Sequence, residues 1–143
     1  MVPGVKEAKA LSKMMKAHPV FGCGQFNIVN VAGDGDKDEE SKDALQKVRH
    51  AIDTAGDGYT ITLSCGKLTT GVTVPEWTAV FMLSGSFSTS AANYLQTIFR
   101  VQSACNKDGK IKQCCYVFDF APDRTLKMVA ESVAISTKAG KTV

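Results

Sequence analysis

Alternation between strand-like and helix-like segments is the feature that most constrains the fold of this chain. Residues 26–31 (FNIVNV) and 59–63 (YTITL) are short and rich in β-branched residues, as strands are. Two further strands are predicted at residues 79–83 and 115–120, with a helix at residues 88–101 between them. Such alternation is typical of a parallel sheet with helices on both faces. We therefore predict an α/β fold with a mostly parallel sheet.

Two more helices are predicted around the first strand. Residues 5–17 carry apolar side chains at helical spacing, and this pattern stops where Pro19 disfavours helix at the preceding residue. The second helix follows an acidic loop at residues 32–40, with Ser41 or Asp43 as its N-cap. Strands and helices thus alternate from the start of the chain.

The last helix is predicted to begin at Pro122, a residue favoured at the first helical position. Residues 136–143 are expected to form a flexible tail. With 143 residues, 44% of them hydrophobic, the chain has the size of one domain over 1–143, with a leading helix within about residues 1–20. The apolar side chains expected to face inward from the last helix are Leu126, Val129, Ala130 and Val133.

The charge and cysteine content of the chain place only weak limits on its function. The net charge of +3 permits contact with a polyanion and is too small to indicate one. Five cysteines without CxxC spacing indicate reduced thiols and a cytoplasmic protein. No stretch approaches the length of a membrane span. His18 and His50 have no metal-ligand spacing, so no metal site is predicted.

The segment LTTGVTVP, residues 68–75, follows a predicted strand and has the composition of a phosphate-facing loop. Thr69 and Thr70 supply hydroxyl groups, and Gly71 permits close approach of the backbone to a ligand. In parallel sheets, ligands bind near the carboxyl ends of strands, where this segment is expected. A tight connection without a ligand is the alternative.

A second candidate group lies on the predicted helix at residues 88–101. Asn93, Gln96 and Arg100 follow one another at intervals of three and four, so they share one face of the helix. A solvated helix face with one arginine is the alternative reading.

Asp119 and Arg124 lie where the last strand meets the last helix. Asp119 is expected to satisfy backbone donors at this junction or to pair with Arg124. Binding a cation or orienting Arg100 are further alternatives for Asp119.

LTTGVTVP and YLQTIFRVQ (94–102) resemble motifs V and VI in the second RecA-like domain of superfamily 2 helicases and translocases, of the kind found in ATP-driven restriction enzymes. The resemblance implies a three-layer RecA-like domain. It implies that Thr69, Thr70 and Gly71 bind nucleic acid, and that Gly71, Thr73 and Arg100 face the nucleotide. Gln96 and Arg100 take the catalytic positions, and Arg124 is an accessory candidate for a second arginine.

By the same resemblance, the parent protein hydrolyses ATP with Mg between two RecA-like domains and moves along DNA, with RNA left open. Its partner is then the N-terminal RecA-like domain, and a membrane is not a partner. The chain contains no Walker A loop and no acidic box. The fragment alone is therefore expected to bind no cofactor and to be inactive.

Three residues depart from the family's pattern. Thr73 stands where the family has aspartate, Phe99 where it has glycine, and Ser103 where it has a second arginine. Two other functions therefore stay open. One is a noncatalytic nucleic-acid-binding or protein-docking module that retains the RecA-like fold. The other is a small α/β domain unrelated to motors.

Overall fold

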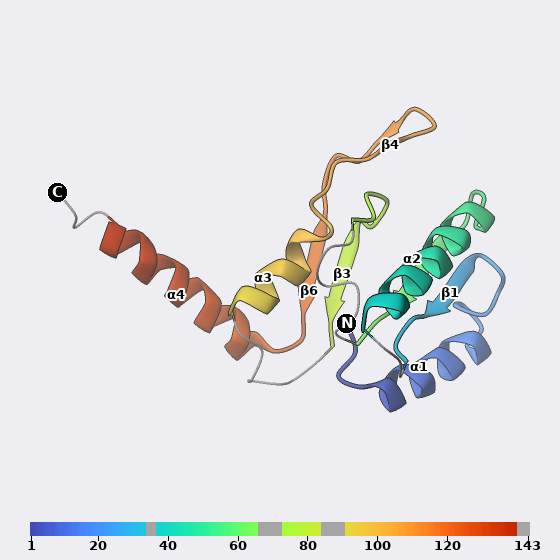
Figure 1. The fold of residues 1–143 in the computed structure, drawn as a ribbon, viewed down its shortest axis with the longest axis horizontal. Coiled ribbons are helices and arrows are strands. Elements are labelled where there is room, and N and C mark those ends of the chain that lie inside the picture. The colour runs from blue at the N-terminus through green and yellow to red at the C-terminus, as the bar shows by residue number, and fades with distance from the viewer. Residues whose placement is uncertain (34–36, 66–72, 84–90, 140–143) are drawn as a thin grey trace. The chain divides into compact units, whose positions relative to one another are not determined.

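The computed structural model divides the chain into two compact units, Met1–Val74 and Pro75–Val143 (Figure 1). Each unit combines helices with a pair of parallel strands, which confirms the predicted α/β character. The described strands form two-stranded sheets, so the three-layer RecA-like arrangement is not confirmed. The structure describes residues 1–33, 37–65, 73–83 and 91–139.

A helix followed by a β-α-β unit makes up the first unit. Its elements are α1 (Val5–Ala17), β1 (Phe26–Asn30), α2 (Lys37–Thr54) and β2 (Tyr59–Leu63). Strands β1 and β2 are parallel neighbours, with Phe26 opposite Tyr59 and Asn30 opposite Leu63. Parallel strands need a long crossover connection, and α2 provides it.

The core of the first unit brings α1 together with the β1–β2 pair. Val2, Ala8 and Leu63 are buried there. Helix α1 ends as predicted, since His18 is extended before Pro19 and its N–H donates to the carbonyl of Met15 at 3.1 Å. The partly buried side chains packed around this core are Leu11, Met15, Ile28, Ala32 and Ile61.

Gly58 is needed where the chain enters β2. A Cβ atom at this position would lie 2.7 Å from the carbonyl oxygen of Gln25 and 3.0 Å from that of Ala55. The same two oxygens accept hydrogen bonds from the N–H groups of Tyr59 and Gly58, both at 2.8 Å. The backbone therefore approaches too closely for any side chain at the start of the β1–β2 pairing.

The second unit is built on another parallel pair. Its elements are β3 (Ala79–Met82), α3 (Ala91–Phe99), β4 (Asn106–Lys107), β5 (Lys110–Ile111), β6 (Tyr116–Asp119) and α4 (Pro122–Ala139). Strands β3 and β6 pair with Ala79 opposite Tyr116 and Met82 opposite Asp119. Each of these two strands agrees with its predicted range to within one residue at each end.

A β-hairpin between α3 and β6 was not predicted. Strands β4 and β5 are antiparallel and are joined by Asp108 and Gly109. These two residues have φ values of 52° and 76°, as the central residues of a type I′ turn require. The dipeptide Asp-Gly is itself a strong hairpin signal, so the sequence contained the information.

The predicted start of the second helix was wrong. Helix α2 begins at Lys37, inside the predicted acidic loop, so Ser41 and Asp43 lie within the helix and do not cap it. Lysine and glutamate are good helix formers, and their propensity outweighs the turn preference of the aspartates. Asp43 pairs instead with Lys47, one turn later, at 2.7 Å on the exposed surface.

The predicted inward face of the last helix was also wrong. Leu126 and Val129 are 68% and 57% exposed, whereas Arg124 and Met128 are 5% and 9% exposed. Ala130 is exposed as well, and the side chain of Val133 lies outside the described part. Helix α4 also continues to Ala139, through part of the predicted tail. Arg124, which forms a buried ion pair at the first turn, lies on the inward face instead.

We predict that Gly58→Ala destabilises the first unit by about 1–3 kcal/mol, because the new methyl group overlaps two backbone oxygens. Urea unfolding followed by circular dichroism measures the change. Asp57→Ala is the matched control, since it introduces alanine at the neighbouring exposed position of the same turn. Equal stability of the two variants would contradict the close approach seen at Gly58.

Candidate functional site

The carboxyl ends of β3 and β6 form an edge of the second unit, and Asp119 lies at this edge. The two strands are parallel, and Met82 is opposite Asp119, so both strands end together. Asp119 Oδ1 accepts a hydrogen bond from the N–H of Ala121 at 2.9 Å and so shapes the turn into α4. This is the edge at which ligands bind in parallel α/β sheets.

Asp119 and Arg124 form a buried, bidentate ion pair at this edge. Arg124 Nη2 lies 2.6 Å from Oδ1, and Arg124 Nε lies 3.1 Å from Oδ2. The two side chains are only 4% and 6% exposed. Thr125 Oγ1 adds a hydrogen bond to Oδ2 at 3.2 Å. The structure thus brings these two predicted site residues together in the way expected from their spacing.

The electrostatics of this edge follow from the pair. Hydrogen bonds from Arg124 lower the pKa of Asp119 to about 2, although burial acts in the opposite direction. The guanidinium of Arg124 lies over the ring of Tyr94 from α3, with its carbon 5.7 Å from the ring centre. Burial raises the pKa of the Tyr94 phenol. Asp119 is therefore ionised at neutral pH, and Arg124 engages both oxygens of its carboxylate.

Arg124 keeps one polar atom that Asp119 does not satisfy. Its Nη1 is buried, and none of the described residues offers it an acceptor. The role of Arg124 as a second arginine stays a prediction, as does the role of Asp119 as an accessory residue.

The predicted catalytic residues lie on and just after α3. Gln96 is exposed, and Arg100 is half-buried immediately beyond the last helical residue. Tyr94, Thr97 and Val101 form the buried side of this segment. Gln96 is exposed as predicted, but Leu95 and Phe99, which were expected to pack inward, are exposed as well, at 36% and 52%. The predicted separation of a polar face from an apolar face is therefore only partly correct, and the catalytic role of Gln96 stays a prediction.

The predicted nucleic-acid-binding residues Thr69, Thr70 and Gly71 lie outside the described residues. Thr73, the next predicted residue, is exposed, and its carbonyl accepts a hydrogen bond from Arg49 Nη2 at 3.2 Å. Val74 beside it is fully buried. Thr73 is therefore held by α2 in the first unit.

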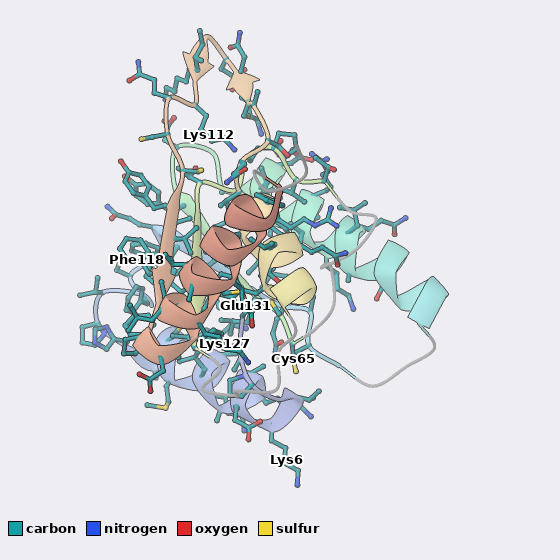
Figure 2. The ribbon with its side chains drawn as sticks, turned by 90° about the vertical axis from the view of Figure 1, so that its left-hand side faces the viewer. Lys6, Cys65, Lys112, Phe118, Lys127 and Glu131 are labelled. Atoms are coloured by element: carbon teal, nitrogen blue, oxygen red, sulfur yellow. The ribbon has the colours of Figure 1, made fainter. Side chains whose placement is uncertain are left out.

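Lys112 is a polar centre that the sequence did not suggest. It lies at the base of the β4–β5 hairpin (Figure 2), and its ammonium donates to three backbone carbonyls. The acceptors belong to Pro75, Trp77 and Val101, at 2.8, 3.0 and 2.9 Å. No local sequence pattern predicts these contacts, because two of the acceptors lie more than 30 residues away in sequence.

Within the described part of the chain, no group of three His, Cys, Asp or Glu side chains is placed to hold a metal ion. All five cysteines are free thiols. No described helix has both the length and the apolar character needed to cross a membrane.

The chain is similar to a Mycoplasma pneumoniae protein named as the C-terminal part of a candidate type II restriction enzyme and methyltransferase. The two are 36% identical over 129 residues, which cover 85% of this chain. The match spans only 17% of the length of that protein. No protein-family model matches the chain, and no solved structure matches it significantly.

We predict that Arg124→Met destabilises the second unit by about 3–5 kcal/mol, because it leaves the Asp119 carboxylate buried without its charged partner. Denaturant unfolding measures the loss. Lys127→Met is the matched control, because Lys127 is an exposed cation on the same helix (Figure 2). A loss no greater than that of the control would show that the pair contributes little.

The pair also predicts an acid sensitivity. The pKa of Asp119 is about 2 in the folded chain and 3.8 ordinarily. The pair's contribution is thus complete above about pH 4 and is lost as the pH falls toward 2, a change of about 2 kcal/mol. Asp119→Asn removes this part of the pH dependence, whereas Asp123→Asn, at an exposed neighbouring position, keeps it. Unfolding free energies measured across this range test the difference, and parallel curves for wild type and Asp119→Asn would contradict it.

Proposed function

We propose that this chain is a segment of a restriction–modification protein that acts on DNA in the cytoplasm. The observation that carries the proposal is the 36% identity over 129 residues to a candidate restriction enzyme and methyltransferase. The similarity covers 85% of the chain, so it is not confined to one short motif. Because the chain spans 17% of that relative, the activity of the whole protein is part of the proposal.

Within that protein, we propose that the chain serves an ATP-driven motor that moves on DNA. The support comes from LTTGVTVP and YLQTIFRVQ, which follow the order of motifs V and VI and keep part of their pattern, namely Thr70, Gly71, Gln96 and Arg100. The relative's name mentions restriction and methyl transfer and does not mention a motor. Thr69, Thr70 and Gly71 then contact the nucleic-acid backbone, and a preceding RecA-like domain is the partner across the ATP site.

Arg100 and Gln96 have the chemistry that this role requires. A guanidinium directed at the phosphates stabilises the charge that develops on the transferred phosphoryl oxygens. Arg100 follows directly after α3, and its N–H donates to the carbonyl of Thr97 at 3.3 Å, so its side chain starts from an ordered backbone. Gln96 lies one turn earlier and is exposed, so its side-chain amide is suited to hydrogen-bond the nucleotide or the water that attacks it. Bound ATP with Mg supplies the phosphoryl group.

A noncatalytic DNA-binding or docking module is the second candidate. Phe99 and Ser103 favour it, because they replace the glycine and the second arginine of motif VI. The nearby Arg124 is held by Asp119 at 2.6 Å and is not a simple replacement. In this case the parent protein binds DNA in a salt-dependent way without ATP hydrolysis.

We predict that Arg100→Ala in the full-length protein lowers ATP turnover by about 1,000-fold or more, because the phosphoryl charge loses its guanidinium. DNA affinity should change by less than about threefold, since phosphate contacts elsewhere supply it. Steady-state ATPase assays and fluorescence anisotropy with labelled DNA measure the two quantities.

Arg100→Lys should recover only part of the turnover, because a lysine lacks the planar fork of donors. Lys127→Ala on α4 is the control for loss of an exposed cation. Unchanged turnover in Arg100→Ala would overturn the assignment of Arg100.

A further inference from the structure

Helix α1 carries a stripe of lysines along one face. The lysines follow one another at intervals of three, four and three residues, and all of them are exposed: Lys6, Lys9, Lys13 and Lys16. Since each residue turns the helix by about 100°, the four side chains start within an arc of about 80°. From Lys6 to Lys16 this lysine stripe is about 15 Å long, because each helical residue adds about 1.5 Å. Figure 2 shows Lys6 pointing away from the ribbon.

The charge of the lysine stripe is not balanced within α1. Glu7 is the one acidic residue of this helix, and no lysine stands three or four residues from it. The carboxylate of Glu7 lies against Gly4, at the start of the helix. Among the described residues, no carboxylate forms an ion pair with a lysine of the stripe. In this part of the chain, the stripe is thus a surface of like charge.

This arrangement does not serve the stability of the helix. Lysines that stand three or four residues apart on a helix repel one another, and the stripe contains three such neighbouring pairs. Lys6 lies in the first turn, where the helix dipole favours negative charge. Helix α2 of the same unit differs, because its Lys47 pairs with Asp43 one turn away at 2.7 Å. A polyanion that neutralises the lysine stripe would remove this repulsion.

The surroundings of α1 indicate which polyanion fits. A helix that lies on a membrane needs a free apolar face, but Ala8, Leu11 and Met15 of α1 pack into the core of the first unit. Protein interfaces are depleted in lysine at their core. A lysine is a hydrated point charge on a flexible stem and suits contacts with phosphates. Duplex DNA carries one negative charge per about 1.7 Å of its axis, so about 15 Å of duplex offers enough phosphates for four lysines.

We propose that α1 binds the phosphate backbone of duplex DNA through the lysine stripe. The inference rests on the proposed function as a restriction–modification protein that acts on DNA, and it depends neither on LTTGVTVP nor on Arg100. The stripe lies within the first unit and consists of described residues. Contacts to phosphates position a protein on DNA and carry no sequence information directly. Loss of the stripe therefore weakens binding to unrelated DNA sequences equally.

The test measures binding of two labelled duplexes of unrelated sequence to the full-length protein, by fluorescence anisotropy over a range of salt concentrations without ATP. Lys9→Gln/Lys13→Gln removes two charges from the middle of the stripe, and glutamine has a helix propensity close to that of lysine. Lys9→Arg/Lys13→Arg keeps both charges. The matched control is Lys110→Gln/Lys127→Gln, which removes two exposed lysines from the second unit and the same net charge. Thermal unfolding reports whether each variant folds.

The salt dependence gives a quantitative expectation. The logarithm of DNA affinity falls with the logarithm of salt concentration by about 0.9 for each phosphate that the protein neutralises. Lys9→Gln/Lys13→Gln should therefore make this slope shallower by about 2 and weaken binding at low salt by about 10-fold, equally for both duplexes. Lys9→Arg/Lys13→Arg and the matched control should both remain near wild type.

Several outcomes would overturn the proposal. Unchanged slope and affinity in folded Lys9→Gln/Lys13→Gln would leave the stripe to an acidic protein partner. An equal loss in the matched control would show that net charge alone matters, and a loss with one duplex only would contradict a backbone contact. If the double variant does not fold, Lys9→Gln and Lys13→Gln are measured singly, each with an expected slope change of about 1. Unfolding of both single variants would assign the lysines to structure.

The wild-type protein separates this proposal from the proposed function. A full-length wild-type protein that binds no duplex DNA at low salt would overturn the function in restriction and modification, and the stripe with it. Wild-type binding that the loss of stripe lysines leaves unchanged would overturn the role of α1 alone.

Discussion

The second unit depends on the buried pair between Asp119 and Arg124. This pair joins the end of β6 to the first turn of α4 through two hydrogen bonds of 2.6 and 3.1 Å. The guanidinium also lies over Tyr94, which brings α3 to the same point. A buried pair of this kind tolerates neither loss of one partner nor rotation of the helix that carries it. The carboxyl edge of the β3–β6 pair is therefore held by charge as well as by apolar packing.

Prediction from the sequence succeeded where local signals are clear, and it failed at the face of α4 that carries Arg124. Strand β2, Tyr59–Leu63, was predicted to the residue, because five consecutive residues with strand propensity stand between clear turn signals. The predicted inward face of α4 was wrong. The helical periodicity of Leu126 and Val129 indicates that face, but Arg124, which pairs with Asp119, is buried in their place. The pairing of Asp119 with Arg124 was among the predicted alternatives, because the two residues stand at the junction of the last strand and the last helix.

Sequence patterns do not predict contacts between residues that are far apart in the sequence. Lys112 binds the carbonyls of Pro75 and Trp77, which lie 37 and 35 residues earlier, and no periodicity reports such a contact. These backbone acceptors have no residue-type signature, so nothing in the sequence marks them. The residues of LTTGVTVP and YLQTIFRVQ are identified instead by their resemblance to motifs V and VI. Their roles therefore depend on the ligands they would meet, and the fold of the chain alone does not assign them.

We propose that this chain is part of a DNA-acting motor within a restriction–modification protein, with Arg100 as its contribution to the ATP site. ATP turnover by the wild-type full-length protein, measured with and without duplex DNA, tests this claim most directly. The account predicts that DNA raises turnover several-fold or more, because DNA and nucleotide sites in such a motor are coupled. Binding of DNA without any ATP hydrolysis would contradict it and would favour the noncatalytic module.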